Sequence, residues 1–315
     1  MNRPVSGPGR RLRTAVCTLL LIAALGMLLG GIGCERQTSS GKLKVVVTIF
    51  PLADFVKNVA GDKVEVVTLL QAGDSPHTYE PSSGDMKAVA EARLLVINGA
   101  GLDFWVQKIE QGASADLIVV DTSMIPTMEG ALLAGEEHEE GGASDGGVNP
   151  HFWLDPILAQ KQVEAIASAL VMVDPNNKDF YLDNAAKYIG ELESLDEEIR
   201  EATILFSPRE FITFHPSWTY FARRYGLVEA AVMVQSHGQE PDIKHAIDVG
   251  KEFHVKAIFA EPQFTTSVDA AKTVAAETGA EVLVLDPIGG PRLEGRDSYI
   301  ALMRYNVDKM GEAMK

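Results

Sequence analysis

The sequence predicts an α/β protein of two related lobes, each a parallel β-sheet flanked by helices, joined by one long rigid helix. Short apolar runs alternate with helical patterns throughout, which is typical of parallel sheets covered by helices. Part of the first half recurs about 160 residues later, and an unusually long helical pattern separates the two copies. These three observations together favour two lobes over one large domain.

Eight short runs rich in Val, Ile, Leu and Phe are the predicted strands. They are residues 43–48, 64–69, 94–98 and 117–121 in the first lobe, and 211–214, 228–233, 257–260 and 282–285 in the second. Helical patterns lie between most of them, so each set is expected to form a parallel sheet.

The predicted repeat is based on short segments that occur in the same order in both halves of the chain. VTIFP at residues 47–51 is echoed by ITFHP at 212–216, and a Phe and a Gly follow each at similar spacing. A Glu-Pro pair at 80–81 is likewise echoed at 240–241. The matches indicate two copies of one βαβα unit, with chance similarity between short units as the alternative.

The long helix is predicted from Pro175 to Thr203, with Asp174 as its N-cap. Apolar residues recur within it at alternating steps of three and four. At 1.5 Å per residue such a helix is on the order of 44 Å long, enough to span both lobes. The alternative is two helices broken at Gly190.

The chain begins like an exported protein. Four arginines precede an apolar stretch that ends near residue 33, and no acidic residue occurs before Glu35. We therefore expect residues 1–33 to be a signal peptide, with an uncleaved anchor or a twin-Arg signal as alternatives. The stretch ends in Gly-Ile-Gly-Cys, which resembles a bacterial lipobox and predicts lipidation of Cys34. Residues 34–42 would then be a tether, 43–173 the first lobe, 174–203 the joining helix and 204–315 the second lobe.

The net charge and the cysteine content limit the classes of partner and the types of metal ligand. The net charge of −16 argues against nucleic-acid binding. Cys17 would leave with the signal and Cys34 would carry lipid, so a metal would be held by N and O ligands. Residues 135–147 are acidic and Gly-rich and are expected to form a flexible loop.

Three histidines and one aspartate carry the functional prediction. His77, His151 and His215 each lie where an apolar run gives way to a Pro-containing turn, and Asp286 directly follows the last predicted strand. Ligands of open α/β sheets bind at the carboxyl ends of the strands, so the four side chains can converge there. Three imidazoles and one carboxylate complete a tetrahedral zinc shell.

Other polar residues have simpler interpretations. Capping or core roles suffice for His237, His245 and His254, and helix N-capping suffices for Asp155. Glu80 lies close enough to His77 to orient its ring or replace it as a ligand, although an exposed helix start explains it equally well.

Six ordered motifs resemble the solute-binding lipoproteins of bacterial zinc and manganese ABC importers, the ZnuA or TroA type. They are SPHTYEPS at 75–82, NGAGLD at 98–103, PHFWLDP at 150–156, FHPSW at 214–218, AEPQF at 260–264 and LDPIGG at 285–290. The resemblance covers about residues 42–315. It departs at Asn149, where the family usually has Asp, and in the 135–147 loop, where one histidine, His138, stands among glutamates.

The resemblance implies a function and its partners. The family's metal ligands correspond to His77, His151, His215 and Asp286, and its interlobe helix to residues 175–203. We expect a monomeric, non-enzymatic protein, anchored outside the cytoplasm by its N-terminal lipid, that passes metal to a membrane permease with a cytoplasmic ATPase. Three imidazoles favour Zn²⁺ as the transported ion, with Mn²⁺ or Fe²⁺ as alternatives. The alternative classes of protein are a metallohydrolase and an adhesin.

Overall fold

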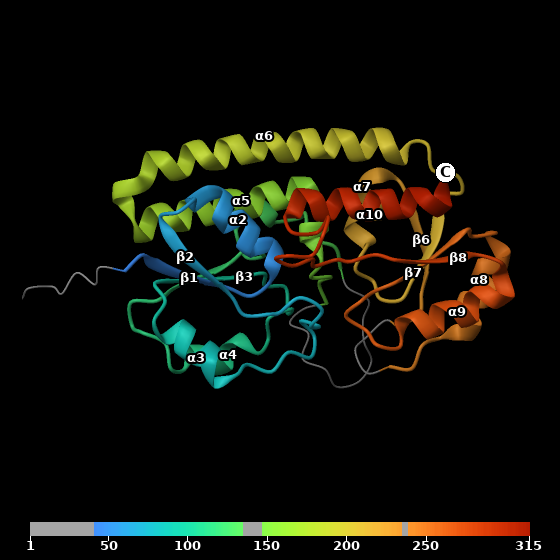
Figure 1. Ribbon diagram of the computed structural model, residues 1–315, viewed down its shortest axis with the longest axis horizontal. Coiled ribbons are helices and arrows are strands. Elements are labelled where there is room, and N and C mark those ends of the chain that lie inside the picture. Colours follow the sequence, from blue (N-terminus) through green and yellow to red (C-terminus); the bar gives the residue numbers. More distant parts are fainter. Residues whose placement is uncertain (1–40, 135–146, 235–238) are drawn as a thin grey trace, which may run out of the picture. The chain divides into compact units, whose positions relative to one another are not determined.

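The computed structural model describes residues 41–134, 147–234 and 239–315. Within them, two four-stranded sheets of parallel strands lie in separate halves of the chain (Figure 1). The first consists of β1 (Leu43–Val47), β2 (Val64–Thr68), β3 (Leu94–Ile97) and β4 (Ile118–Asp121). The second consists of β5 (Glu210–Thr213), β6 (Val228–Val232), β7 (Ala257–Ala260) and β8 (Glu281–Val284). All eight predicted strands are present, with ends that differ by one residue at most.

The two sheets share one strand order. It is β2-β1-β3-β4 in the first lobe and β6-β5-β7-β8 in the second, so the second copy repeats the first strand for strand. This is the topology that the predicted repeat requires. The fold class is therefore confirmed as two helix-flanked parallel sheets with a long helix.

Helices cover both sheets. Those of the first lobe are α2 (Phe50–Ala60), α3 (Ser83–Ala90), α4 (Val106–Glu110) and α5 (Pro156–Val173), with short 3₁₀ turns at Pro126–Met128 and Phe152–Leu154. Those of the second are α7 (Thr219–Tyr225), α8 (Ile243–Glu252), α9 (Ser267–Thr278) and α10 (Tyr299–Met314). Asp155 is the N-cap of α5 as predicted, because its Oδ1 accepts the N–H of Ile157 at 2.8 Å.

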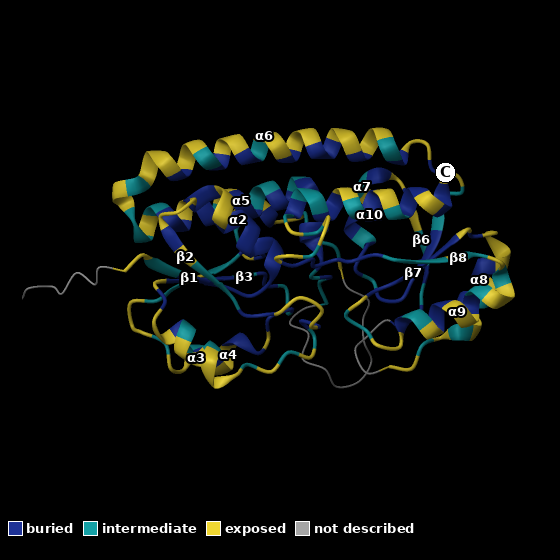
Figure 2. Ribbon diagram, in the orientation of Figure 1, coloured by how far each residue is buried: buried dark blue, intermediate teal, exposed yellow. Residues whose placement is uncertain are grey.

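The long helix, α6, spans Lys178–Thr203 and continues through Gly190, so the alternative of two helices is wrong. Its predicted start was three residues early, because Pro175–Asn177 forms a 3₁₀ turn. Asp174 is not a backbone cap either; its carboxylate accepts from the side chains of Asn177 and Tyr181, at 2.7 Å each. α6 packs against α2 and α5 of the first lobe and α7 and α10 of the second, while much of its outer face is exposed (Figure 2).

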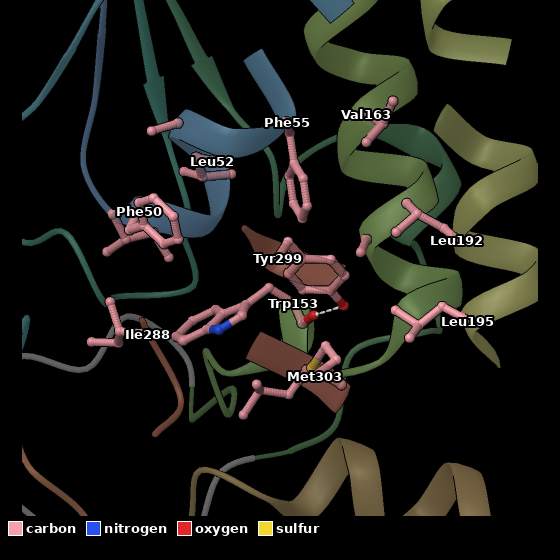
Figure 3. Packing of buried hydrophobic residues seen from close by; sticks show 14 of the residues in the cluster. Phe50, Leu52, Phe55, Trp153, Val163, Leu192, Leu195, Ile288, Tyr299 and Met303 are labelled. Carbon is pink, nitrogen blue, oxygen red and sulfur yellow. Dashed lines mark hydrogen bonds between the residues drawn. The ribbon is translucent and has the colours of Figure 1, made fainter. Parts of the chain in front are cut away.

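One apolar cluster joins the lobes beneath α6. It contains Phe55 from α2, Leu192 and Leu195 from α6, and Tyr299 from α10, all fully buried (Figure 3). Tyr299 also donates its hydroxyl to the carbonyl of Trp153 at 2.6 Å. The lobes are thus fixed to each other by packing on the side next to α6, which leaves the ends of the strands to form the site.

Among the described residues, none of the helices combines the length and apolarity needed to cross a membrane. The predicted signal peptide, Cys34 and all but one of the residues of the acidic loop lie outside the described residues. The boundaries assigned to the two lobes stay predictions.

Candidate metal centre

The structure brings three of the four predicted ligands together. His77 lies in the turn that follows β2, His151 precedes the 3₁₀ turn before α5, and His215 follows β5. The Nε2 atom of His77 lies 3.4 Å from that of His151 and 3.1 Å from that of His215. Two ligands therefore come from the first lobe and one from the second.

These separations match the geometry of a metal site. In a tetrahedral site with Zn–N bonds of about 2.05 Å, two ligand nitrogens lie about 3.3 Å apart. Ligand atoms of the three histidines all lie within 4.8 Å of one another, and no other His, Cys, Asp or Glu of the described residues joins the group. The cluster therefore fits a metal ion bound through three imidazoles.

Burial keeps at least one of these imidazoles neutral. His151 and His215 are 3% and 5% exposed, and His77 is half-buried. Burial, with smaller contributions from the charges of His215 and His77, lowers the pKa of His151 well below its usual range. A neutral ring is the form that binds metal, so His151 is ready to do so without releasing a proton.

The first lobe holds His151 through the NGAGLD motif. Asn98 donates its amide to the carbonyl of Pro150 at 2.9 Å, directly before His151. Asp103 accepts the N–H of Gly99 at 2.7 Å and so fixes the turn that follows Asn98. Gly99 has φ of 83°, and a Cβ there would lie 1.8 Å from Oδ1 of Asp121, so only glycine fits. The motif is a support for the site and contributes no ligand.

Asp286 lies at the predicted position after β8, but its carboxylate already accepts hydrogen bonds from four donors. Its Oδ1 accepts from the amide of Gln263 and from the N–H groups of Ile288 and Gly289, at 2.9 to 3.1 Å. Its Oδ2 accepts from Nη1 of Arg296 at 2.8 Å. The side chain is only 2% exposed, so this ion pair lies inside the protein. Asp286 is therefore placed near the cleft without joining the histidine cluster.

A cleft lined by both lobes surrounds the histidines. Besides them it is lined by Ser75, Pro76, Trp153, Ser217, Glu261, Gln263, Phe264, Pro287 and Ile288. Glu261 is 1% exposed, and burial raises the pKa of its carboxyl well above its usual range, although the hydrogen bond from Ser217 opposes this. Burial at this position therefore disfavours the charged form of the carboxyl.

The remaining candidates lie away from the cluster. Glu80, His245 and His254 are exposed and do not belong to the group of candidate ligands, and the exposure of His245 and His254 rules out a core role for both. Sequence reasoning missed Arg296 and Gln263 as the partners of Asp286. Gln263 lies inside the AEPQF motif and could have been found there, whereas no local pattern marks Arg296.

Comparison with known proteins agrees with this geometry. The family model described as the periplasmic component A of a zinc-uptake complex, ZnuA, matches residues 45–313. The chain belongs to the ZnuA family. It is therefore the metal-binding component of an ABC importer and not an enzyme, as the six motifs implied.

Relatives within the ZnuA family differ in the metal they are named for. The high-affinity zinc uptake protein ZnuA of Bacillus subtilis is 33% identical over 94% of this chain and 97% of its own length. The manganese-binding lipoprotein MntA of Halalkalibacterium halodurans is 31% identical over 93% of this chain and 96% of its own.

Solved structures of the ZnuA family show the same fold. A crystal structure of ZnuA superposes with a TM-score of 0.76 at 33% identity, covering 87% of this chain and 100% of that one. A zinc-bound ZnuA deletion mutant gives 0.74 at 32% identity, covering 87% and 98%.

Proposed function

We propose that this protein captures Zn²⁺ between its lobes through His77, His151 and His215, with Asp286 as a fourth ligand, and delivers the ion to a membrane permease. The single observation that carries the proposal is the convergence of three Nε2 atoms at separations typical of tetrahedral zinc. Three imidazoles are a softer set than manganese prefers, which favours zinc.

Asp286 can become a ligand only if it exchanges a donor. Among the described residues, Oδ2 accepts a hydrogen bond from Arg296 alone. This oxygen can therefore bind a metal ion once the guanidinium moves away. We propose that a divalent ion replaces the single charge of Arg296 on this carboxylate. The exchange keeps a buried carboxylate paired throughout, which avoids the cost of an isolated buried charge.

The proposed location is outside the cytoplasm, at the membrane. The proposal includes export by residues 1–33 and anchoring to the membrane through lipid on Cys34. Support comes from relatives named as lipoproteins, such as the manganese substrate-binding lipoprotein PsaA of Streptococcus pneumoniae, 31% identical over 95% of this chain and 98% of its own length.

Manganese is the second candidate cargo, because relatives named for manganese are nearly as similar as those named for zinc. The two are separated by elemental analysis of the protein purified from its own host, followed by titration of the metal-free protein with each ion. The proposal predicts one equivalent of zinc and tighter binding of zinc than of manganese. Manganese in the purified protein, with zinc absent, would overturn the zinc assignment. Normal growth of a deletion strain under zinc limitation would instead favour the adhesin alternative.

A further inference from the structure

Asn149 is a buried residue whose side chain lies between the lobes. It is 7% exposed and precedes Pro150 and His151 in the first lobe. Its amide Nδ2 donates to the carbonyl of Pro216 at 2.9 Å, in the segment directly after His215 of the second lobe. Its Oδ1 lies 3.0 Å from the backbone nitrogen of His151 and 2.9 Å from Nδ1 of the same residue.

The orientation of this amide is fixed by its backbone partners. The N–H of His151 can only donate, so the Asn149 atom facing it must be the oxygen. The carbonyl of Pro216 can only accept, so the atom facing it must be the NH₂ group. A flipped amide would place donor against donor and acceptor against acceptor, and both bonds would be lost.

The fixed amide in turn selects the tautomer of His151. Because Oδ1 of Asn149 can only accept, Nδ1 of His151 must carry the ring proton. The other nitrogen, Nε2, then keeps its lone pair, and Nε2 is the atom that faces Nε2 of His77. Partners of this kind behind a histidine commonly fix which nitrogen binds metal.

We propose that Asn149 is a positioning residue that both sets the metal-binding tautomer of His151 and ties the two lobes together around the ion. The inference rests on the proposed function, since the tie matters only if metal is held by both lobes. No other side chain of the same size combines the acceptor and the donor that these two tasks need.

A carboxylate at this position would do only the first task. It could accept from both N–H groups of His151, but it would face the carbonyl of Pro216 with a second acceptor. The nearby hydroxyl of Thr219 would not compensate, because it donates to Glu229 at 2.8 Å. The Asn149→Asp variant should therefore keep the tautomer and lose the tie, whereas Asn149→Leu should lose both.

Two measurements on the full-length protein separate these tasks. Long-range ¹H–¹⁵N correlation spectra of the zinc-free protein report which nitrogen of His151 carries the proton. Stopped-flow mixing of the Zn²⁺-loaded protein with excess chelator reports the rate of zinc release. The control is Asn184→Asp, which removes a similar amide-to-carbonyl bond of 3.0 Å to Val59, within the first lobe and α6.

We expect His151 to be protonated on Nδ1 in the wild type and in Asn149→Asp, and to be a mixture of tautomers in Asn149→Leu. Zinc release should be about fivefold faster in Asn149→Asp, since the lost hydrogen bond contributes on the order of 1 kcal/mol. Release from Asn184→Asp should stay within twofold of the wild type. If Asn149→Leu fails to fold, the wild type and Asn149→Asp still decide both tasks.

A wild-type His151 protonated on Nε2 would overturn the tautomer assignment, and unchanged zinc release in Asn149→Asp would overturn the tie. Either result leaves the proposed function standing. A wild-type protein that binds no zinc would overturn the proposed function, whereas the spectra of the zinc-free protein would still report the tautomer.

Discussion

Arg296 donates from Nη1 to Oδ2 of Asp286 at 2.8 Å, and the two residues that follow Asp286, Pro287 and Ile288, line the cleft that holds the three histidines. The side chain of Asp286 is 2% exposed and that of Arg296 is 23% exposed, so the pair is largely removed from water. The guanidinium also lies over the ring of Tyr305, with its carbon 4.9 Å from the ring centre. Arg296 is thus an internal cation on the carboxylate proposed to receive the metal.

Replacing Arg296 should lower the stability of the zinc-free protein and raise its affinity for zinc. In Arg296→Gln the buried carboxylate loses its counter-charge, which typically costs about 3–5 kcal/mol of unfolding free energy. A divalent ion would no longer have to displace a cation, so the zinc-induced rise in melting temperature should exceed that of the wild type. Thermal melts with zinc and with chelator measure both effects.

The matched control is Arg304→Gln, whose guanidinium forms an exposed two-bond pair with Glu198 at 2.8 and 2.9 Å. It should leave the zinc-induced rise unchanged, because exposed pairs contribute little. An equal zinc-induced rise in wild type and Arg296→Gln would show that Arg296 does not compete for Asp286.

Asp103 should make the stability of the zinc-free protein depend on pH. Burial raises the pKa of its carboxyl to about 7, against an ordinary value of 3.8. The unfolded chain therefore releases this proton near pH 4 while the folded protein keeps it to about pH 7, so stability falls as pH rises through that window. Asp103→Asn removes this contribution and keeps an acceptor for the N–H of Gly99.

The measurement is the melting temperature at pH 5 and pH 7.5 in the presence of chelator. Between pH 5 and pH 7.5 the melting temperature of the wild type should fall by more than that of Asp103→Asn. Other buried acids, such as Glu261, titrate in both proteins and cancel in the comparison. Parallel pH profiles for the two proteins would show that Asp103 is not held in its protonated form.

Replacing the acidic loop should leave tight binding intact. Ala134 and Val148 form an antiparallel bridge, so a two-residue Asn-Gly turn can connect them in place of residues 135–147. Calorimetric titration should give a zinc affinity within tenfold of the wild type, a difference of about 1.4 kcal/mol. A larger loss would mean that the loop belongs to the site.

Bound zinc should stabilise the fold through both lobes. An ion that binds only the folded state adds RT ln(1 + [L]/Kd), about 4 kcal/mol when free zinc is a thousand times Kd. His215→Ala removes the histidine ligand proposed for the second lobe and should abolish most of the zinc-induced rise in melting temperature. His254→Ala, at an exposed position, should behave like the wild type. Equal rises in wild type and His215→Ala would contradict a clamp between lobes.

Much of the fold and part of the site could be predicted from sequence because their signals are local. The strands are short apolar runs bounded by turns, and each histidine lies within a recognisable motif, although only His215 closely follows a strand. The start of α6 was misplaced because the carboxylate of Asp174 binds side chains rather than the backbone. Propensity cannot distinguish these two uses of an aspartate.

The partners of Asp286 and the role of Asn149 could not be predicted in the same way. Arg296 lies ten residues after Asp286 in a stretch with no periodic pattern, and only the folded chain brings its guanidinium to the carboxylate. The bond from Asn149 to Pro216 joins residues 67 apart and depends on how the two lobes meet. Contacts between elements that are distant in sequence cannot be recognised from one amino-acid sequence.

The central claim is that His77, His151 and His215 hold one metal ion between the lobes. Crystals of the protein loaded with one equivalent of Zn²⁺, with anomalous data collected on both sides of the zinc edge, test it most directly. We expect one anomalous peak in the cleft, with Nε2 of each of the three histidines at about 2.1 Å. A peak elsewhere, or any of these nitrogens beyond about twice that distance, would contradict the account.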